Sequence, residues 1–170
     1  MDNATNHQDG QEALTSLAGK YLTFRLGEED YGLEILKVQE IIGLQEITTI
    51  PRTPAAFRGV INLRGKVIPV VDLRQKFAME TAAASRKTCI IVVQISAGTD
   101  GNRIMGVIVD EVSEVLTIGS EEIEPPPDFG PGIETGFILA MAKTRGGVKL
   151  LLDLDRVLTG DELAAVAESA

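Results

Sequence analysis

The feature that most constrains this chain is an internal repeat. A turn, an apolar strand and an Asp-Leu ending at residues 64–73 recur 81 positions later, at residues 145–154. The residues that recur at this spacing are Arg64, Gly65, Val67, Asp72 and Leu73. A second set recurs 74 positions later. Its members are Gly32, Val38, Glu40 and Pro51, which correspond in this order to Gly106, Val112, Glu114 and Pro125. A loop insertion accounts for the difference in spacing. The sequence therefore predicts two copies of one module, each about half of the chain.

Hydrophobic spacing divides the first copy into short strands. Residues 21–26 alternate as a strand does, whereas residues 31–42 have a mixed period that leaves strand or short helix open. Residues 60–63 and 67–71 flank Arg64-Gly65 and predict a hairpin. Asp72 is a good N-cap and predicts a short helix through Phe77.

The second copy follows the same plan. Its hairpin turn is predicted at residues 99–102, where Asp-Gly tolerates positive φ angles. Asp153 is expected to cap a second short helix. The strands expected in this half are residues 88–95, 104–109, 110–118, 136–142 and 148–152.

Short strands separated by Gly and Pro favour an all-β fold with short helices. Only 4% of residues are aromatic and none is Trp, so the core must consist of Val, Ile and Leu. About five strands per copy are expected to close into a small barrel, which removes exposed edges. Two such barrels must share an apolar interface, because each alone would be marginally stable.

Composition also predicts the domain limits. Residues 1–19 are polar and are expected to form a disordered tail. One folded unit is expected over residues 20–160, with a first barrel at about 20–80 and a second at about 86–160. The small polar residues between them form the boundary. Residues 161–170 form an acidic C-terminal tail.

Charge and hydropathy exclude several classes of function. The net charge is −9, and no cluster of Lys and Arg exists that could bind nucleic acid or an anionic membrane. The longest apolar run, near residues 89–93, is far shorter than the ~18 residues of a membrane span. The N-terminus lacks the basic start and apolar centre of a secretory signal, and one cysteine cannot form an internal disulfide. We therefore expect a cytoplasmic protein.

The sequence offers little for catalysis. His7, the only histidine, lies in the polar tail, and Cys89 begins an apolar strand where an inert core thiol is expected. Neither a nucleophile elbow nor a phosphate-binding loop is present. Residues 128–130 (Asp-Phe-Gly) lie in a proline-rich loop and read as a turn, and the acidic runs lack calcium-ligand spacing. We predict no enzyme activity, no cofactor and no metal site.

Arg64 allows two interpretations from the sequence alone. It can be a solvated turn residue, or the partner of a carboxylate such as Asp72. It can equally be an interface arginine, since Arg is enriched in binding hot spots and pairs well with carboxylates and carbonyls. Val38 can be a core residue or a contact residue, and Glu40 a solvated charge or a contact residue.

Several motifs, in their order and spacing, resemble the CheW family, the coupling proteins of bacterial chemotaxis. The resemblance covers about residues 20–158. The motifs are YGLEILKVQEI at residues 31–41, Pro51, GVINLRG at 59–65, IPVVDL at 68–73, and GVIVD at 106–110 with Val112 and Val115. The run Pro125-Pro126-Pro127 departs from the family pattern and stiffens a loop of the second barrel.

The resemblance implies a fold and partners. The fold is two intertwined five-stranded SH3-like β-barrels, in agreement with the repeat. The partners are the cytoplasmic tips of chemoreceptors and the regulatory domain of the histidine kinase CheA, which would recruit the protein to membrane receptor arrays. The implied receptor contacts are Ile35, Val38, Glu40, Arg64, Ile90, Gly106 and Val112. The implied kinase contacts are Ile47 and Thr48.

Three alternatives remain open from the sequence. The chain can be a coupling protein of another chemosensory pathway, such as one for surface motility. It can be a fragment of a larger coupling protein with a phosphorylatable receiver domain, although the short tail after residue 160 argues against this. It can also be a small-ligand-binding or enzymatic β-barrel.

Overall fold

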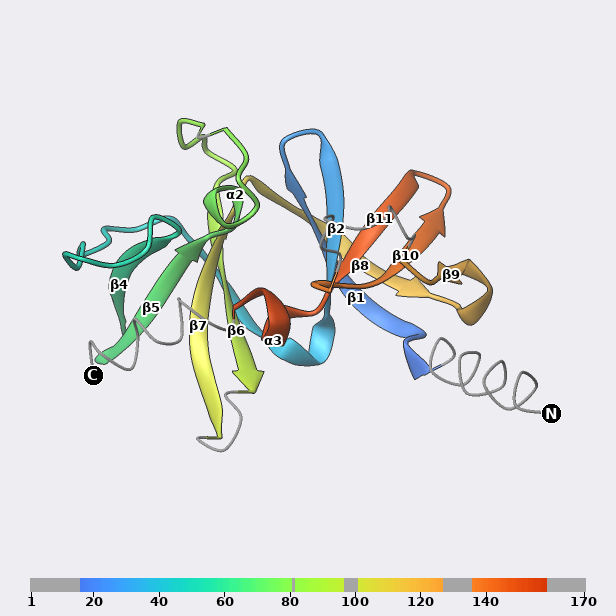
Figure 1. Ribbon diagram of the computed structural model, residues 1–170, viewed down its shortest axis with the longest axis horizontal. Coiled ribbons are helices and arrows are strands. Elements are labelled where there is room, and N and C mark those ends of the chain that lie inside the picture. The colour runs from blue at the N-terminus through green and yellow to red at the C-terminus, as the bar shows by residue number, and fades with distance from the viewer. Residues whose placement is uncertain (1–15, 81, 97–100, 127–135, 159–170) are drawn as a thin grey trace.

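Two β-sheets make up the fold, and each takes strands from both copies of the repeat (Figure 1). The structure is a computed structural model that describes residues 16–80, 82–96, 101–126 and 136–158. His7, the Asp-Phe-Gly turn and the acidic C-terminal tail lie outside the described residues, as do residues 1–15 of the N-terminal tail. Gly19, which we expected in that tail, begins the first strand.

The six-stranded sheet has the order β8-β1-β2-β11-β10-β9. Its strands are β1 (Gly19–Leu26), β2 (Glu29–Glu34), β8 (Glu111–Ile118), β9 (Ile123–Glu124), β10 (Ile138–Thr144) and β11 (Gly147–Leu152). The five-stranded sheet has the order β3-β6-β7-β5-β4. Its strands are β3 (Val38–Gly43), β4 (Phe57–Leu63), β5 (Lys66–Asp72), β6 (Cys89–Ser96) and β7 (Asn102–Val109). The short helices are η1 (Ile35–Lys37), α2 (Leu73–Lys76), η3 (Ser120–Glu122) and α3 (Leu154–Val157).

The two copies exchange their first hairpins. In Figure 1, β1 and β2 lie with β10 and β11, and β6 and β7 lie with β4 and β5. Two parallel pairings make the exchange, Leu151 opposite Gly32 and Val70 opposite Gly106. These pairings are equivalent under the repeat, because Val70 corresponds to Leu151 and Gly32 to Gly106. The duplication and the intertwining are therefore confirmed.

The exchange corrects the expected barrel limits of 20–80 and 86–160. Residues 19–34 belong to the sheet of the second copy, and residues 89–109 belong to that of the first. Strand periodicity could not reveal this, because it identifies a strand but not the strand's partner.

Both sheets are strongly curved. In each sheet, the segment that follows one edge strand pairs with a strand at the opposite side of the same sheet. After β3, the N–H of Thr48 donates to the carbonyl of Val60 in β4, and the reverse bond forms as well, both at 2.9 Å. In the other sheet, β9 follows β8 and pairs with β10. Gly59 permits the first closure, since its φ is 139° and an added Cβ would lie 2.1 Å from the Thr48 carbonyl oxygen.

Local chemistry explains the turns and helix starts. Arg64 and Gly65 both have positive φ, 53° and 86°, and form the two-residue turn of the predicted β4–β5 hairpin. Asp72 accepts from the N–H of Arg74 at 2.9 Å, and Asp153 accepts from that of Arg156, so both predicted helix caps are confirmed. The undecided region at residues 31–42 contains two strands with a 3₁₀ turn between them.

The largest hydrophobic cluster lies between the two sheets. Phe24 and Leu33 from the six-stranded sheet meet Val93 and Val107 from the five-stranded one, and all four side chains are buried. We call this the central cluster. Each sheet also encloses a smaller cluster of its own, around Leu151 in one and Ile90 and Ile68 in the other. The expected shared apolar interface is therefore present, and it holds most of the core.

Candidate functional site

A two-pronged ion pair joins opposite edges of the five-stranded sheet. Arg64 at the β4–β5 turn donates from Nη1 to Oε1 of Glu40 in β3 at 2.8 Å, and its Nη2 contacts Oε2. The Arg64 side chain is 70% exposed and that of Glu40 is 29% exposed. The partner of Arg64 is therefore Glu40 and not Asp72, which caps α2 and pairs with Arg58 at 3.2 Å.

Stability alone does not explain an arginine at this turn. An exposed ion pair contributes about 0–1 kcal/mol. Left-handed backbone costs an L-residue other than glycine about 1–2 kcal/mol. The pair with Glu40 thus at best offsets the conformational cost of Arg64, and it holds a guanidinium with spare donors at the surface. This is the arrangement expected of a residue kept for binding.

Three further predicted contact residues line the junction between the sheets. Ile35 lies in η1, Val38 begins β3, and Val112 follows the start of β8. All three are partly exposed and pack against the central cluster. They therefore offer a partner apolar surface on a rigid base.

Ile90 and Gly106, in contrast, are buried. A Cβ on Gly106 would lie 2.8 Å from Cγ2 of Ile90, so the glycine makes room for that side chain. Gly106 is in register with Val92, which is in register with Glu40. These two residues shape the sheet beneath Glu40, and in this structure they cannot contact a partner directly.

The two predicted kinase contacts lie where the five-stranded sheet closes. Ile47 is partly buried against the small cluster of that sheet. Thr48 is exposed, and its backbone makes the closure with Val60. Only the Thr48 side chain is thus fully available at this position.

Exposed apolar residues, which we did not predict, recur at equivalent positions. Val67 and Val148 are 64% and 47% exposed, and Ile41 and Val115 are 45% and 50% exposed. The pairs are separated by 81 and 74 positions, the two repeat spacings. Leu36, in η1, is 92% exposed. Comparing the copies for recurrent apolar residues would have indicated these surface positions, which suit protein contacts.

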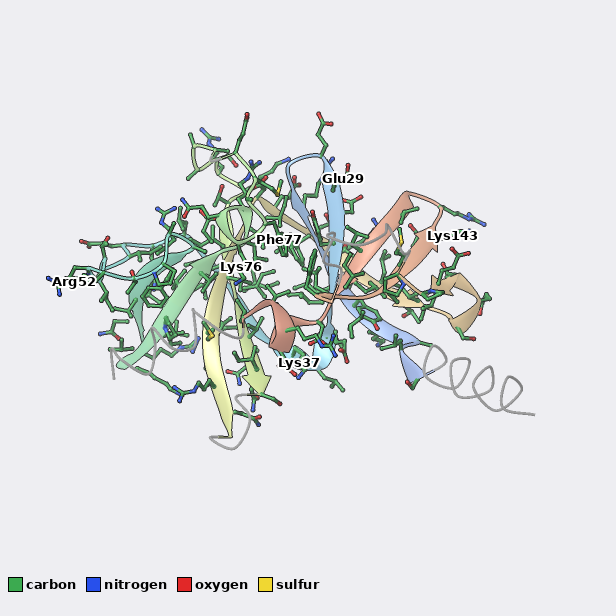
Figure 2. The ribbon with its side chains drawn as sticks, in the orientation of Figure 1. Glu29, Lys37, Arg52, Lys76, Phe77 and Lys143 are labelled. Atoms are coloured by element: carbon green, nitrogen blue, oxygen red, sulfur yellow. The ribbon has the colours of Figure 1, made fainter. Side chains whose placement is uncertain are left out.

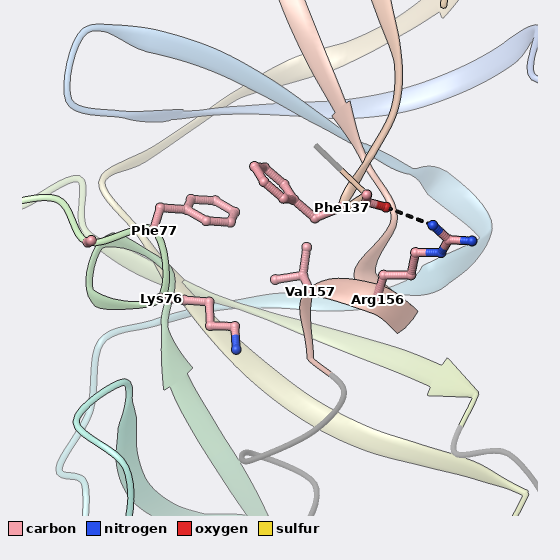
Figure 3. A pocket seen from close by; sticks show the side chains of 7 residues that line it. Lys76, Phe77, Phe137, Arg156 and Val157 are labelled. Atoms are coloured by element: carbon pink, nitrogen blue, oxygen red, sulfur yellow. Dashed lines mark hydrogen bonds between the residues drawn. The ribbon is translucent and has the colours of Figure 1, made fainter. Parts of the chain in front are cut away.

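A cavity of about 810 Å³ opens between α2 and α3 (Figure 3). The rings of Phe77 and Phe137 stack across it, with centroids 5.2 Å apart. Arg156 uses Nη1 to donate to the carbonyl of Gly136 at 3.2 Å. The described residues of its lining include Lys76 and Arg156 but no carboxylate, histidine, serine or cysteine, so they supply no carboxylate or imidazole for general acid–base work.

Three further observations concern the thiol, possible metal ligands and the helices of the described residues. Burial raises the pKa of the Cys89 thiol, which disfavours the reactive thiolate. Within the described ranges, no group of His, Cys, Asp and Glu has the arrangement of a metal site. None of the helices in those ranges has the length and apolar content needed to cross a membrane.

Comparison with known proteins relates the whole described fold to one family. The family model of the CheW-like domain matches residues 20–162. The chain is 37% identical to the chemotaxis protein CheW of Klebsiella aerogenes, covering 92% of this chain and 95% of that one. It is 34% identical to the CheW of Rhizobium meliloti, covering 97% and 99%. The crystallised scaffolding protein TtCheW of Thermoanaerobacter tengcongensis superposes with a TM-score of 0.75 at 38% identity, covering 86% and 96%.

Proposed function

Because this chain belongs to the CheW-like family, we propose that it is a chemotaxis adaptor that couples chemoreceptors to a CheA-type histidine kinase. The observation that carries the proposal is the agreement of two findings. Relatives that match nearly the whole chain are named chemotaxis proteins, and a scaffolding protein shares the fold. We place the protein at the cytoplasmic tips of receptors in membrane arrays.

The receptor-binding surface we propose is the junction between the sheets together with the adjoining ion pair. Ile35, Val38 and Val112 supply apolar contacts, and Arg64 and Glu40 supply a fixed charge pair. Ile90 and Gly106 support this surface from within. A mix of buried apolar contact and oriented arginine is typical of protein-binding hot spots.

The kinase-binding surface we propose lies at the closure of the five-stranded sheet, around Ile47 and Thr48. It comprises other residues than the receptor-binding surface, and we propose that receptor and kinase are bound together. The receptor-side residues Ile35, Val38 and Val112 pack against the central cluster, and Ile47 packs against the smaller cluster of the five-stranded sheet. A shift in the receptor can then change the on/off equilibrium of the kinase through differential contacts, with no chemistry performed by the adaptor.

We propose that the protein is not an enzyme. The cavity between α2 and α3 offers aromatic rings and a positively charged wall, and the described part of that wall has no acid–base pair. Binding and orientation, rather than bond making, are what the described residues can do.

A reconstituted signalling assay tests the proposal. Membranes with a chemoreceptor and a purified CheA-type kinase are mixed with and without this protein, and kinase autophosphorylation is followed with radiolabelled ATP. Coupling predicts that the protein makes kinase activity depend on the receptor ligand. Kinase activity that does not respond to the receptor ligand when this protein is present would refute the proposal. Turnover of ATP by the pure protein would indicate an enzyme instead.

A further inference from the structure

The chain crosses between the two sheets twice, and an ion pair holds each crossing. The first crossing is η1, between β2 and β3, where Nζ of Lys37 lies 3.2 Å from Oδ2 of Asp155 in α3. Figure 2 shows Lys37 beside that helix. The second crossing is at Asp110, between β7 and β8. There Nε of Arg74 in α2 donates to Oδ1 of Asp110 at 2.7 Å, and Nη2 of Arg74 contacts Oδ2.

Each carboxylate also accepts a hydrogen bond at the end of the first strand of an exchanged hairpin. Asp110 accepts from the N–H of Gly27, just after β1, at 2.7 Å. Asp155 accepts from the N–H of Ser96, at the end of β6, at 2.8 Å. In each set, a single carboxylate therefore takes part in the contacts that join a short helix, a crossing segment and the end of a hairpin strand. We call the two sets the first clamp (Lys37, Asp155 and Ser96) and the second clamp (Arg74, Asp110 and Gly27).

The helix residues of the two clamps are equivalent under the repeat, whereas the crossing residues are offset by one position, because Lys37 corresponds to Glu111, which follows Asp110. Arg74 and Asp155 are 81 positions apart and occupy the same place in α2 and α3. The positions along the first hairpin strands also correspond, because Thr23 is opposite Gly32 as Val92 is opposite Gly106. Gly27 follows Thr23, and Ser96 follows Val92, by the same number of residues.

Their charges, however, are inverted. The second clamp has its cation on the helix and its anion on the crossing, whereas the first has the anion on the helix and the cation on the crossing. The four side chains are between 18% and 32% exposed. Both copies thus link the same helix position to the adjoining crossing, with opposite charges and with crossing residues offset by one position. The link itself, rather than any one residue type, is what the two copies share.

The clamps lie next to the apolar residues of the junction. Lys37 stands between Ile35 and Val38, and Val112 follows Asp110 by two positions. These three apolar side chains rest partly exposed on the central cluster. Fixing the backbone at Lys37 and Asp110 therefore fixes where they lie.

We propose that Lys37, Asp155, Arg74 and Asp110 are positioning residues that set the receptor-binding surface, an inference that rests on the proposed adaptor function. Loss of one clamp frees a crossing and a hairpin turn to open locally. The neighbouring contact residues then spend less time in the binding arrangement, and the apparent affinity falls in proportion.

The test compares three acid-to-amide changes in the full chain. Asp110→Asn and Asp155→Asn each remove one ion pair but keep an oxygen that can accept the turn N–H. Glu124→Gln is the matched control, because it removes the ion pair with Lys143 at 2.7 Å, within the β9–β10 pair and away from both crossings. Binding of a soluble chemoreceptor tip fragment is measured by calorimetry, amide exchange at Gly27 and Ser96 by NMR, and melting by circular dichroism.

We expect each clamp variant to weaken fragment binding by about 2- to 30-fold, the range seen for residues that act through others. Exchange should rise at Gly27 in Asp110→Asn and at Ser96 in Asp155→Asn. Glu124→Gln should match the unmodified protein in all three measurements. Clamp variants that remain folded and bind the fragment with unchanged affinity would overturn the inference.

A charge inversion separates positioning from mere stability. Arg74→Asp together with Asp110→Lys rebuilds the second clamp in the form of the first. Each single change places like charges together and should weaken binding, whereas the double variant should recover most of the affinity as well as the melting temperature. Recovery of melting without recovery of binding would contradict positioning. If the unmodified, folded protein fails to bind the fragment, the adaptor function itself fails and the positioning role falls with it.

Discussion

Replacing Arg64 with asparagine should separate stability from partner binding. Arg64 and Gly65 have φ angles of 53° and 86°, the pattern of a hairpin turn in which Asn-Gly is preferred. Relief of the left-handed arginine is worth about 1 kcal/mol. The lost ion pair with Glu40 is worth about 0–1 kcal/mol, at the low end because the Arg64 side chain is 70% exposed.

These terms nearly cancel, so the free energy of unfolding should change by less than about 1 kcal/mol. For a chain of this size that corresponds to a shift in Tm of at most about 2–4 °C. Binding is different, since an interface arginine contributes about 2 kcal/mol or more. Losing that contribution in Arg64→Asn should raise the Kd for a receptor tip fragment by about 30-fold. Arg64→Glu should weaken binding further, because it places a second carboxylate against Glu40, and should still fold.

Thermal melting and calorimetric titration with the fragment check both halves of this expectation. Arg145→Asn is the matched control, since Arg145 occupies the equivalent turn and no ion pair joins it to Glu114 within the described part of the chain. It should leave both quantities unchanged. The reasoning is refuted if Arg64→Asn unfolds the protein, or if it binds the fragment with unchanged affinity.

Further expectations follow from the closure, the pKa shifts and the exchanged hairpins. Gly59→Ala places a Cβ 2.1 Å from the carbonyl oxygen of Thr48. The lost hydrogen bonds and the backbone strain should lower the free energy of unfolding, measured in urea, by about 3 kcal/mol or more, and a loss below about 1 kcal/mol would contradict this. Burial raises the pKa of Tyr21 to about 12. The stabilisation from the neutral phenol is therefore complete below the pKa of about 10 that tyrosine has in the unfolded chain, and it is lost as the pH rises toward 12. Phenolate absorbance near pH 10 from both tyrosines of the folded protein would contradict this. The hydrogen bond from Arg74 lowers the pKa of Asp110, so its stabilisation is present above about pH 4 and disappears as the pH falls through the lowered pKa; melting profiles of Asp110→Asn should lose that part of the acid dependence. A cut after Ala83 should leave two fragments that melt broadly or aggregate alone but reassociate when co-expressed, because each lacks strands for its sheet; a sharp melt of either fragment alone would count against the exchange.

Features encoded within a few residues could be predicted from the sequence. The Arg64-Gly65 hairpin and the Asp72 and Asp153 caps depend on local backbone preference and local hydrogen bonds, and all three are present. The repeat was also readable, because it requires only comparison of the chain with itself. In the 31–42 region the mixed period had a physical cause, a 3₁₀ turn between two strands.

Features that depend on distant partners could not be predicted in this way. Nothing near Arg64 indicates that Glu40, rather than Asp72, lies beside it, because that contact needs the sheet to close. The burial of Ile90 and Gly106 follows from their place in a central pair of strands, not from residue type. The exchange of hairpins likewise depends on parallel pairings between residues far apart in the chain.

The duplication offers a physical basis for the two partners that we propose. A repeat gives two similar frameworks, and the hairpin exchange fuses them through one large core, so that neither framework moves freely without the other. The strand pairing by which the hairpins are exchanged is common to both copies, whereas the surface contacts differ. The Arg64–Glu40 ion pair has no counterpart between Arg145 and Glu114 among the described residues, and the clamps have opposite charges. A doubled module of this kind keeps a common strand pairing and varies its surface contacts, which suits the proposed adaptor function with two unlike partners.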